Sequence, residues 1–358
     1  MCSESPNDSA TGLPTEINFE QLREMVESEF TVDEGLIEYN VSTFYVRSSQ
    51  DSKKAFLRLV KRLDAFELVP VLRDNEGKVV LQIVRKPPAK SSRKIINWVL
   101  FLATIGTTLI TGYILSLDLA NPLEGAVMFA VALLGILGSH EMAHKVAANM
   151  HGIESTLPYF IPGPPPPIGI GTFGAVIQQK SLAPNRDALF DLGASGPIVG
   201  FIVSIIVTII GVPLSSLKVW EGESVLPGSP LLFGVLANIF PPSGTGNLIL
   251  LHPVAFAGWV GMFVTLMNLI PAGMLDGGHT IRSMLGPKVS KFLSIFVIII
   301  LFVLNPYLYW LIAMLAFFFS SQRHPGPLDD VSKLTTSRKL VTVVVILIFV
   351  LCLAPMWF

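Results

Sequence analysis

Apolar and polar residues follow two different patterns along the chain. Between Ile17 and about Val84, apolar residues recur with the spacing of amphipathic helices and strands, and charged residues separate them. After Lys94 the apolar runs approach the 20 or so residues that a helix needs to cross a bilayer. The pattern therefore predicts a soluble α/β domain at 17–88, a linker at 89–94 and a set of membrane helices beyond it.

The N-terminal part shows two helical and three strand-like segments. Apolar residues share one helical face at Phe19, Leu22, Met25 and Val26, and again at Phe56, Leu57, Val60 and Leu63. Strand-like runs occupy Leu36–Arg47, Glu67–Leu72 and Lys78–Val84, and the turn signal Asn75-Glu76-Gly77 separates the last two. Residues 1–16 are small and polar and include Pro, which is typical of a disordered tail.

The apolar segments after Lys94 predict six or seven transmembrane helices. We expect spans near 95–117, 123–149, 187–213, 252–272, 289–304, 306–320 and 339–357. The two spans around Asn305-Pro306 are short and could form one bent hairpin. The expected fold is thus an all-α polytopic membrane protein with a small N-terminal α/β domain. In it, residues 95–320 form the membrane core, 321–338 a cytoplasmic loop and 339–357 a C-terminal transmembrane helix.

Composition supports a membrane protein and argues against several other classes. Hydrophobic residues make up 51% of the 358 and charged residues only 14%, against about 25% charged in soluble proteins. The net charge of -1 leaves no basic excess for nucleic-acid binding. Cys2 and Cys352 lie at opposite ends, which favours neither disulfides nor a Cys-based metal site. The first twenty residues contain acids but no Lys or Arg, unlike a signal or transit peptide, so we expect insertion through the internal apolar segments.

Positive charges predict the orientation of the spans. Lys and Arg cluster before the first span and between alternate spans: Arg85, Lys86, Lys90, Arg93 and Lys94, then Lys145, Lys180 and Arg186, then Arg282, Lys288 and Lys291, then Arg323, Lys333, Arg338 and Lys339. The long 214–251 loop carries only Lys218. By the positive-inside rule, the N-terminal domain is expected to be cytoplasmic, in a multi-pass protein of the cell membrane, with the 214–251 loop outside.

The second span contains a metal-binding pattern. His140 and His144 are four residues apart, about 400° and 6 Å along a helix, so both imidazoles leave the same face. Such a pair fits two corners of a tetrahedral zinc site, and Glu141 between them can reach the water as a general base. Two satisfied buried histidines beside an incidental Glu are the alternative, but ionisable residues in an apolar span are costly and usually functional.

A third ligand is expected from the end of the fourth span. That segment runs from Asn268 through Pro271 to Asp276, Gly277, Gly278 and His279, and charge alternation places it on the same side of the membrane as the histidine pair. Asp276 and His279 are both candidates. Asp276 is favoured because the two glycines make a continued helix improbable, and because a carboxylate beside two imidazoles leaves a net charge of only about +1 in a low dielectric.

These motifs resemble the site-2 protease family of intramembrane zinc metalloproteases, peptidase family M50, especially its archaeal and plastid EGY-type members. The resemblance covers roughly 95–290 and includes the segments Phe173–Ile177 and Phe190–Pro197. It implies zinc (Zn²⁺) held by His140, His144 and Asp276, Glu141 as the base and Asn268 as a polar aid to the scissile carbonyl. It covers neither the 17–84 domain nor the last spans, and no PDZ-like insertion is evident.

A glycine-rich segment lies between these motifs. Residues 169–174 match GxGxxG, but they follow Pro164–Pro167 and lack the βαβ surroundings of a nucleotide site. One interpretation is a membrane-dipping hairpin at Thr172–Gln179 whose strand edge binds an unwound substrate. Its expected substrate-binding residues are Thr172, Phe173, Gly174, Ala175, Val176 and Ile177. A stiff Pro-rich connector is the alternative, and the sequence leaves both open.

The sequence thus predicts an intramembrane metalloendopeptidase, a hydrolase that cleaves transmembrane segments of membrane-anchored substrates with zinc-activated water and Glu141 as base. Two rivals remain. A transporter with an ion site in a broken fourth span would make the histidine motif accidental and predicts no bound zinc. A non-proteolytic scaffold of the same fold has no reason to keep His140, Glu141, His144 and Asp276 together. The sequence specifies neither the substrate nor the oligomeric state.

Overall fold

The computed structural model describes residues 17–39, 41–47, 52–87, 94–218, 229–246, 248–304 and 325–353. The chain forms two compact units. Unit 1 comprises residues up to Pro88 together with Leu328–Ser332, and unit 2 comprises Ala89–Pro327 and Lys333–Phe358. The predicted tail at 1–16 and the predicted span at 306–320 lie outside the described residues.

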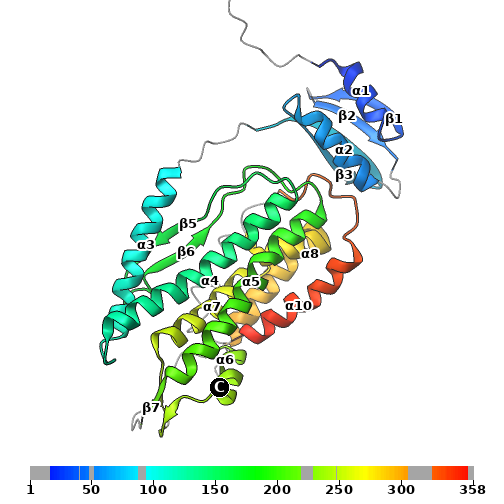
Figure 1. Ribbon diagram of the computed structural model, residues 1–358. Coiled ribbons are helices and arrows are strands. Elements are labelled where there is room, and N and C mark those ends of the chain that lie inside the picture. The colour runs from blue at the N-terminus through cyan, green and yellow to red at the C-terminus, as the bar shows by residue number, and fades with distance from the viewer. Residues whose placement is uncertain are drawn as a thin grey trace, which may run out of the picture. The chain divides into compact units, whose positions relative to one another are not determined.

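Unit 1 is a four-stranded sheet with two helices, built from the amphipathic segments. Its elements are α1 (Phe19–Glu27), β1 (Val32–Glu38), β2 (Val41–Val46), α2 (Ser52–Asp64), β3 (Leu68–Asn75) and β4 (Lys78–Arg85). The strands pair antiparallel in the order β1-β2-β4-β3 (Figure 1). Asn18 caps α1 by accepting a hydrogen bond from the N–H of Gln21, whose side chain bonds back to Asn18. Phe44, Phe56 and Leu59 are fully buried in the core between helices and sheet.

The strand-like run Leu36–Arg47 is two strands and not one. The strands β1 and β2 pair as a hairpin in which Glu38 faces Val41, and Tyr39 between them has a positive φ of 48°. The prediction missed the reversal because the turn has no glycine or proline to mark it.

Five residues from the far end of the chain complete unit 1. The carbonyl of Leu328 accepts hydrogen bonds from the Leu72 N–H (2.9 Å) and from Arg73 Nη1 (2.8 Å). The Leu328 side chain is buried in the same core as Phe44. Asp329 is fully buried, and its Oδ1 accepts the N–H groups of Val331 and Ser332. Part of the stretch predicted as the 321–338 loop is therefore an edge of the N-terminal sheet.

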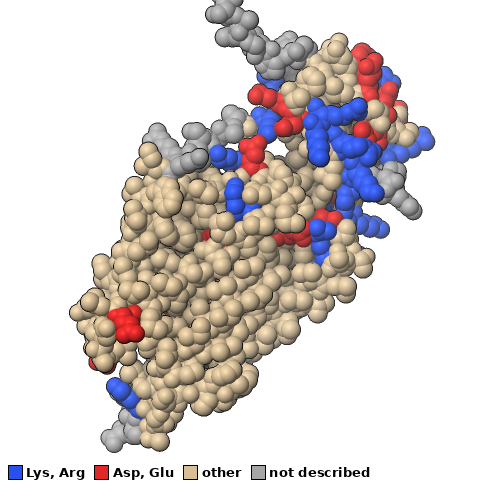
Figure 2. All heavy atoms as spheres, viewed as in Figure 1, with Lys and Arg blue, Asp and Glu red and all other residues tan. Residues whose placement is uncertain are grey.

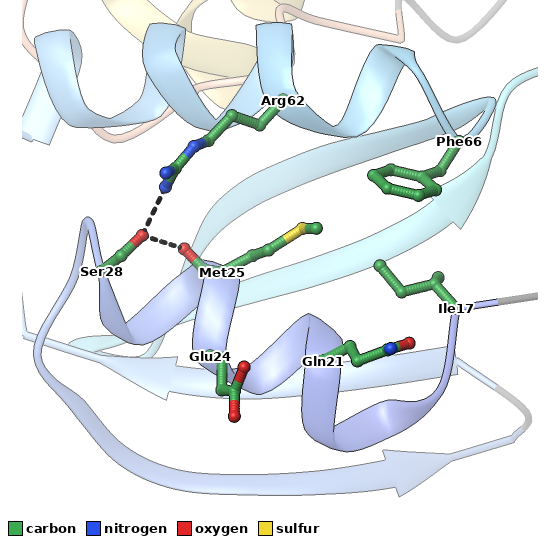
Figure 3. Close-up of a pocket in the computed structure, with 7 residues that line it drawn as sticks. All are labelled: Ile17, Gln21, Glu24, Met25, Ser28, Arg62 and Phe66. Atoms are coloured by element: carbon green, nitrogen blue, oxygen red, sulfur yellow. Dashed lines mark hydrogen bonds between the residues drawn. The ribbon is translucent and has the colours of Figure 1, made fainter.

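Unit 1 also has a shallow hollow of about 580 Å³ beside α1 and α2 (Figure 3). Ile17, Met25 and Phe66 line its apolar part. On its polar side Arg62 donates a 2.6 Å hydrogen bond to the hydroxyl of Ser28, so this guanidinium is engaged within the unit.

Unit 2 is a helical bundle with short strands at its edges (Figure 1). Its helices are α3 (Lys94–Leu115), α4 (Pro122–Met150), α5 (Arg186–Leu214), α6 (Leu231–Ile239), α7 (Pro253–Leu269), α8 (Asp276–Leu304) and α10 (Thr336–Cys352). The strands are β5 (Tyr159–Pro162) and β6 (Thr172–Val176), which form a hairpin, and β7 (Ser216–Lys218), β8 (Ser243–Gly244) and β9 (Leu248–Leu250), which form a small sheet in the 214–251 loop. Helix α5 packs against α4, α7 and α8, which places it at the centre of the bundle.

Four described helices are long and apolar enough to cross a membrane. They are Ile95–Leu115, Pro122–Met150, Arg186–Leu214 and Asp276–Ile300. Helix α7 is apolar but shorter, with 17 residues. Large apolar side chains on these helices point outward, including Leu102 at 64%, Val131 at 67% and Phe292 at 71% exposure. On the face shown in Figure 2, the helical surface of unit 2 is almost free of charged side chains, as lipid contact requires. Unit 2 is therefore the membrane part of a polytopic protein.

Helix α8 differs from the prediction, which began a span at 289 and expected the two glycines to interrupt the helix. In the structure α8 begins at Asp276 and includes Gly277 and Gly278, with a kink at Gly286. A Cβ at Gly277 would overlap the carbonyl of Leu269. These glycines therefore allow the start of α8 to pack closely on the end of α7, and they do not terminate a helix.

Candidate metal centre

Helix α4 carries the histidine pair deep within a 29-residue helix. Asn121 caps its first turn, and Pro122 occupies the first helical position, where no N–H is needed. His140, Glu141 and His144 are buried at 4–6% exposure, whereas Met142 on the opposite face is 46% exposed. As the i, i+4 spacing predicted, the two imidazoles lie together, with their ring centroids 4.7 Å apart.

Asp276 meets this pair from the first turn of α8. The short loop after α7, which contains Pro271 and Gly273, turns the chain so that the Asp276 carboxylate faces α4. Its Oδ2 lies 3.2 Å from His140 Nε2 and 3.2 Å from His144 Nε2, and these two nitrogens are 3.0 Å apart. Within the described residues these three form the single group of His, Cys, Asp or Glu donors compact enough to hold a metal ion.

The donor set fits a tetrahedral zinc site. Bonds of about 2.0–2.1 Å at tetrahedral angles place neighbouring ligand atoms about 3.3–3.4 Å apart, close to the 3.0–3.2 Å observed. His144 Nδ1 donates a 2.7 Å hydrogen bond to the carbonyl of Leu192, so its Nε2 is the nitrogen with a free lone pair. Two imidazoles and one carboxylate leave a fourth position open, as hydrolytic zinc sites require.

Glycines of α5 form the wall behind the donors. A Cβ at Gly193 would lie 2.6 Å from the carbonyl oxygen of Asp276, and one at Gly200 would lie 2.9 Å from His140 Nδ1. A Cβ at Gly196 would overlap the His144 ring. The backbone of α5 can approach the three donors only because these positions, spaced i, i+3 and i+7, carry no side chain.

Two further groups surround the donors. Asn268, in the last turn of α7, has its Nδ2 3.2 Å from His140 Nε2. The carboxylate of Glu141 lies close to the backbone N–H of Ile177, the residue that follows β6. The structure thus brings together all five polar residues singled out by the sequence, although their roles remain predictions.

The segment predicted to bind substrate is a strand beside this centre. In the hairpin, β6 pairs antiparallel with β5, so that Phe160 faces Ala175, and β6 also contacts α4. Phe173 is 74% exposed and Val176 is half exposed, whereas the Thr172 hydroxyl bonds to the Ile161 carbonyl at 2.8 Å. Of the two open interpretations, the geometry is that of a hairpin; substrate binding by it is untested.

The other described histidines are not members of the donor group. His279 is buried in the first turn of α8 but is not among the three clustered donors. His151 ends α4 and its Nε2 lies 2.8 Å from Asp191 Oδ2, and His252 caps α7 through a 3.2 Å hydrogen bond from the Val254 N–H.

Sequence reasoning missed the Leu192 carbonyl, the Ile177 N–H and the α5 glycines as parts of the site. The glycines had a signal, because Gly193, Gly196 and Gly200 recur at helical spacing within an apolar span. The two backbone groups had none, since any residue type carries them.

Comparisons with known proteins agree with this geometry. Residues 128–305 match the model of peptidase family M50. The chain is 33% identical over 251 residues to the probable zinc metalloprotease EGY1, chloroplastic, of Arabidopsis thaliana, covering 65% of this chain and 44% of that protein. It is 32% identical over 252 residues to EGY1 of Oryza sativa subsp. japonica (65% and 41%), and 33% identical over 180 residues to EGY2 of Arabidopsis thaliana (49% and 31%).

The chain spans less than half the length of these curated relatives. No solved structure matches it. The matched segment runs from α4, with its two histidines, to the end of α8, and so includes every donor of the centre. On the family match and on its similarity to the EGY proteins, the chain belongs to peptidase family M50, the site-2 proteases, as an EGY-like member.

Proposed function

We propose that this protein is an intramembrane zinc metalloendopeptidase that hydrolyses peptide bonds in or near transmembrane segments. The observation that carries the proposal is the convergence of the ligand atoms of His140, His144 and Asp276 within 4.8 Å of one another on apolar helices, with both histidines buried and Asp276 partly buried. Membership of family M50 and similarity to the EGY proteins, which are named as probable zinc metalloproteases, support the same activity.

His140, His144 and Asp276 would hold the metal. A zinc ion in their centre would polarise the scissile carbonyl and lower the pKa of water beside it. The hydrogen bond from His144 Nδ1 to the Leu192 carbonyl fixes the tautomer and ring orientation that metal binding requires. The α5 glycine wall excludes bulky groups from one side, so substrate and water must approach from another.

Glu141 is assigned as the general base. It projects from α4 between the two histidines but is not one of the three clustered donors. Its carboxylate can take a proton from the attacking water and return it to the leaving amine. The Ile177 N–H lies near this carboxylate, which places the proposed base next to the end of β6. Asn268, whose amide nitrogen lies 3.2 Å from His140 Nε2, is assigned to donate a hydrogen bond to the scissile carbonyl.

The hairpin suggests how a substrate is presented. A helical peptide bond is shielded by its own backbone hydrogen bonds, so a transmembrane segment must unwind before it can be cut. Among the described strands β6 pairs with β5 alone, and residues Thr172–Ile177 lead directly to the Glu141 contact. An extended substrate pairing with β6 would gain backbone hydrogen bonds next to the base. The expected partners are transmembrane proteins or peptides and the surrounding bilayer.

The Lys and Arg distribution supports a cytoplasmic N-terminal unit in a cell membrane. The metal centre lies on the same side of the bilayer by this orientation, because the C-terminal end of α4 and the start of α8 both adjoin Lys/Arg-rich segments.

Separating metal binding from catalysis tests the proposal. Glu141→Gln is expected to keep one zinc per chain and to lose cleavage of a model transmembrane peptide, because the amide cannot accept a proton. Asp276→Asn is expected to lose both zinc and cleavage. Metal content and cleavage are measured on the purified full-length proteins. Cleavage by the Glu141→Gln protein would overturn the assigned base, and a wild-type chain that binds no zinc would overturn the function.

A further inference from the structure

We infer that Arg338, on the last helix, is a positioning residue for the metal centre, acting on His144 through Asp191 and the first turns of α5. The inference rests on the proposed function. Arg338 lies outside residues 128–305, which match the family model, so this would be a contribution of the chain's C-terminal helix to the family core.

Arg338 binds both carboxylate oxygens of Asp191. Its Nε donates a 2.8 Å hydrogen bond to Asp191 Oδ1, and its Nη2 bonds to Asp191 Oδ2. This two-pronged geometry is the strong form of an Arg–carboxylate pair and fixes orientation as well as distance. Both side chains are largely shielded, Arg338 at 24% and Asp191 at 29% exposure, so solvent screens the pair only in part.

The same guanidinium also anchors the first turn of α5. Arg338 Nη1 lies 3.3 Å from Asp187 Oδ2, and the other oxygen of Asp187 accepts the N–H of Thr335 at 3.0 Å. Arg338 Nη1 in turn donates to the Thr335 hydroxyl at 2.8 Å. Two carboxylates one helical turn apart on α5 are therefore tied to the start of α10 by four hydrogen bonds or ion contacts, which restrains α5 against both sliding and rotation.

The restrained turns lead directly to the metal centre. Asp191 precedes Leu192, whose carbonyl accepts the hydrogen bond of His144 Nδ1. Gly196, one turn further along, lies against the His144 ring. A displacement of the first turns of α5 would therefore move the partner that orients His144 and the backbone that its ring packs on.

A fifth side chain ties α4 into the same cluster. His151, at the end of the helix that carries His140 and His144, has its Nε2 2.8 Å from Asp191 Oδ2. Asp191 thus holds α4 and α10 at one point of α5. A simple interfacial anchor for α5 needs no such convergence on the helix that bears the ligands.

Metal affinity and the ligand-field spectrum test the inference. The purified full-length Arg338→Gln protein is expected to bind zinc about tenfold more weakly in competition with a chromophoric chelator, the low end for an outer-shell partner. Its cobalt(II) derivative should show shifted absorption bands, which report ligand geometry. Arg338→Lys should show a smaller change in both, because an ammonium keeps the charge but not the two-pronged contact. Lys339→Gln is the matched control: it removes an exposed positive charge from the next residue of the same helix and should change neither.

The outcomes distinguish a failure of this inference about Arg338 from a failure of the proposed function. Wild-type zinc affinity and an unshifted cobalt spectrum in Arg338→Gln would overturn the inference, even if thermal stability fell, because that pattern describes a purely structural anchor. If Arg338→Gln does not fold, Arg338→Lys decides by the same two measurements. Failure of the wild-type chain to bind either metal would overturn the proposed function, and this inference with it.

Discussion

Replacing Gly196 by alanine adds one methyl group against the His144 ring. A Cβ built at this position overlaps all three ring atoms nearest to it. Non-bonded heavy atoms need about 3.5 Å or more, so the ring or the α5 backbone must withdraw by at least about 1 Å. The distance between a metal ion and its ligand atom can deviate from its usual value by only about 0.2 Å. The substitution should therefore displace His144 Nε2 from the centre that it forms with His140 and Asp276.

The expected magnitude follows from the cost of overpacking. Adding a methylene to a well-packed site costs about 1–3 kcal/mol. If this whole cost acts on zinc binding, the affinity for zinc falls roughly 5- to 150-fold. Cleavage should fall at least in proportion to zinc occupancy. The assay is chelator-competition titration of the purified full-length protein, with peptide cleavage measured at saturating zinc.

Gly135→Ala supplies the control within the same membrane unit. Gly135 lies in α4, five residues before His140, and a Cβ there meets no atom within 4 Å. Alanine is also the better helix former by about 1 kcal/mol, so zinc affinity should stay unchanged and stability should not fall. If Gly196→Ala bound zinc as tightly as Gly135→Ala, the α5 backbone would not confine His144, and this prediction would be wrong.

Two other predictions concern the third ligand and the topology. His279→Ala should keep its zinc and part of its activity, because His279 is not among the clustered donors; zinc lost from this variant but kept in Asp276→Asn would show that the ligand was misassigned. In a cysteine-free background, an impermeant thiol reagent applied to intact cells should label Lys218→Cys and not Lys61→Cys, since Lys/Arg placement puts unit 1 inside. Both lysines are exposed, whereas Ser52 of the same helix is buried and would report nothing; the reverse labelling pattern would invert the proposed orientation.

Several features could be predicted because they depend on nearby residues. The periodicity of 19–26 and 56–63 predicted α1 and α2, and the turn at 75–77 separated β3 from β4. The spacing of His140 and His144 predicted that both rings leave one face of α4, and the structure shows this. Helical geometry alone imposes that relation, whatever the rest of the chain does.

Local reasoning gave the wrong answer where packing between elements decided the outcome. Gly277 and Gly278 have low helix propensity, so an interrupted helix was expected, yet both lie in α8. Contact with the end of α7 outweighs that propensity, because a side chain at Gly277 would overlap the Leu269 carbonyl. The Leu328–Ser332 segment likewise has no sequence signal for joining a sheet whose last strand ends at Arg85.

By itself, the sequence predicted the long apolar helices α3, α4 and α5, the small N-terminal domain and the two histidines with their intervening glutamate on one helix. Only the tertiary structure brought Asp276 to His140 across 136 residues, the Leu192 carbonyl to His144 across 48, and Arg338 to Asp191 across 147. Periodicity and spacing describe neighbours within a few helical turns. The partners of the metal centre meet only when α4, α5, α8 and α10 pack, because side-chain volume and the glycine wall of α5 then set which polar groups can touch.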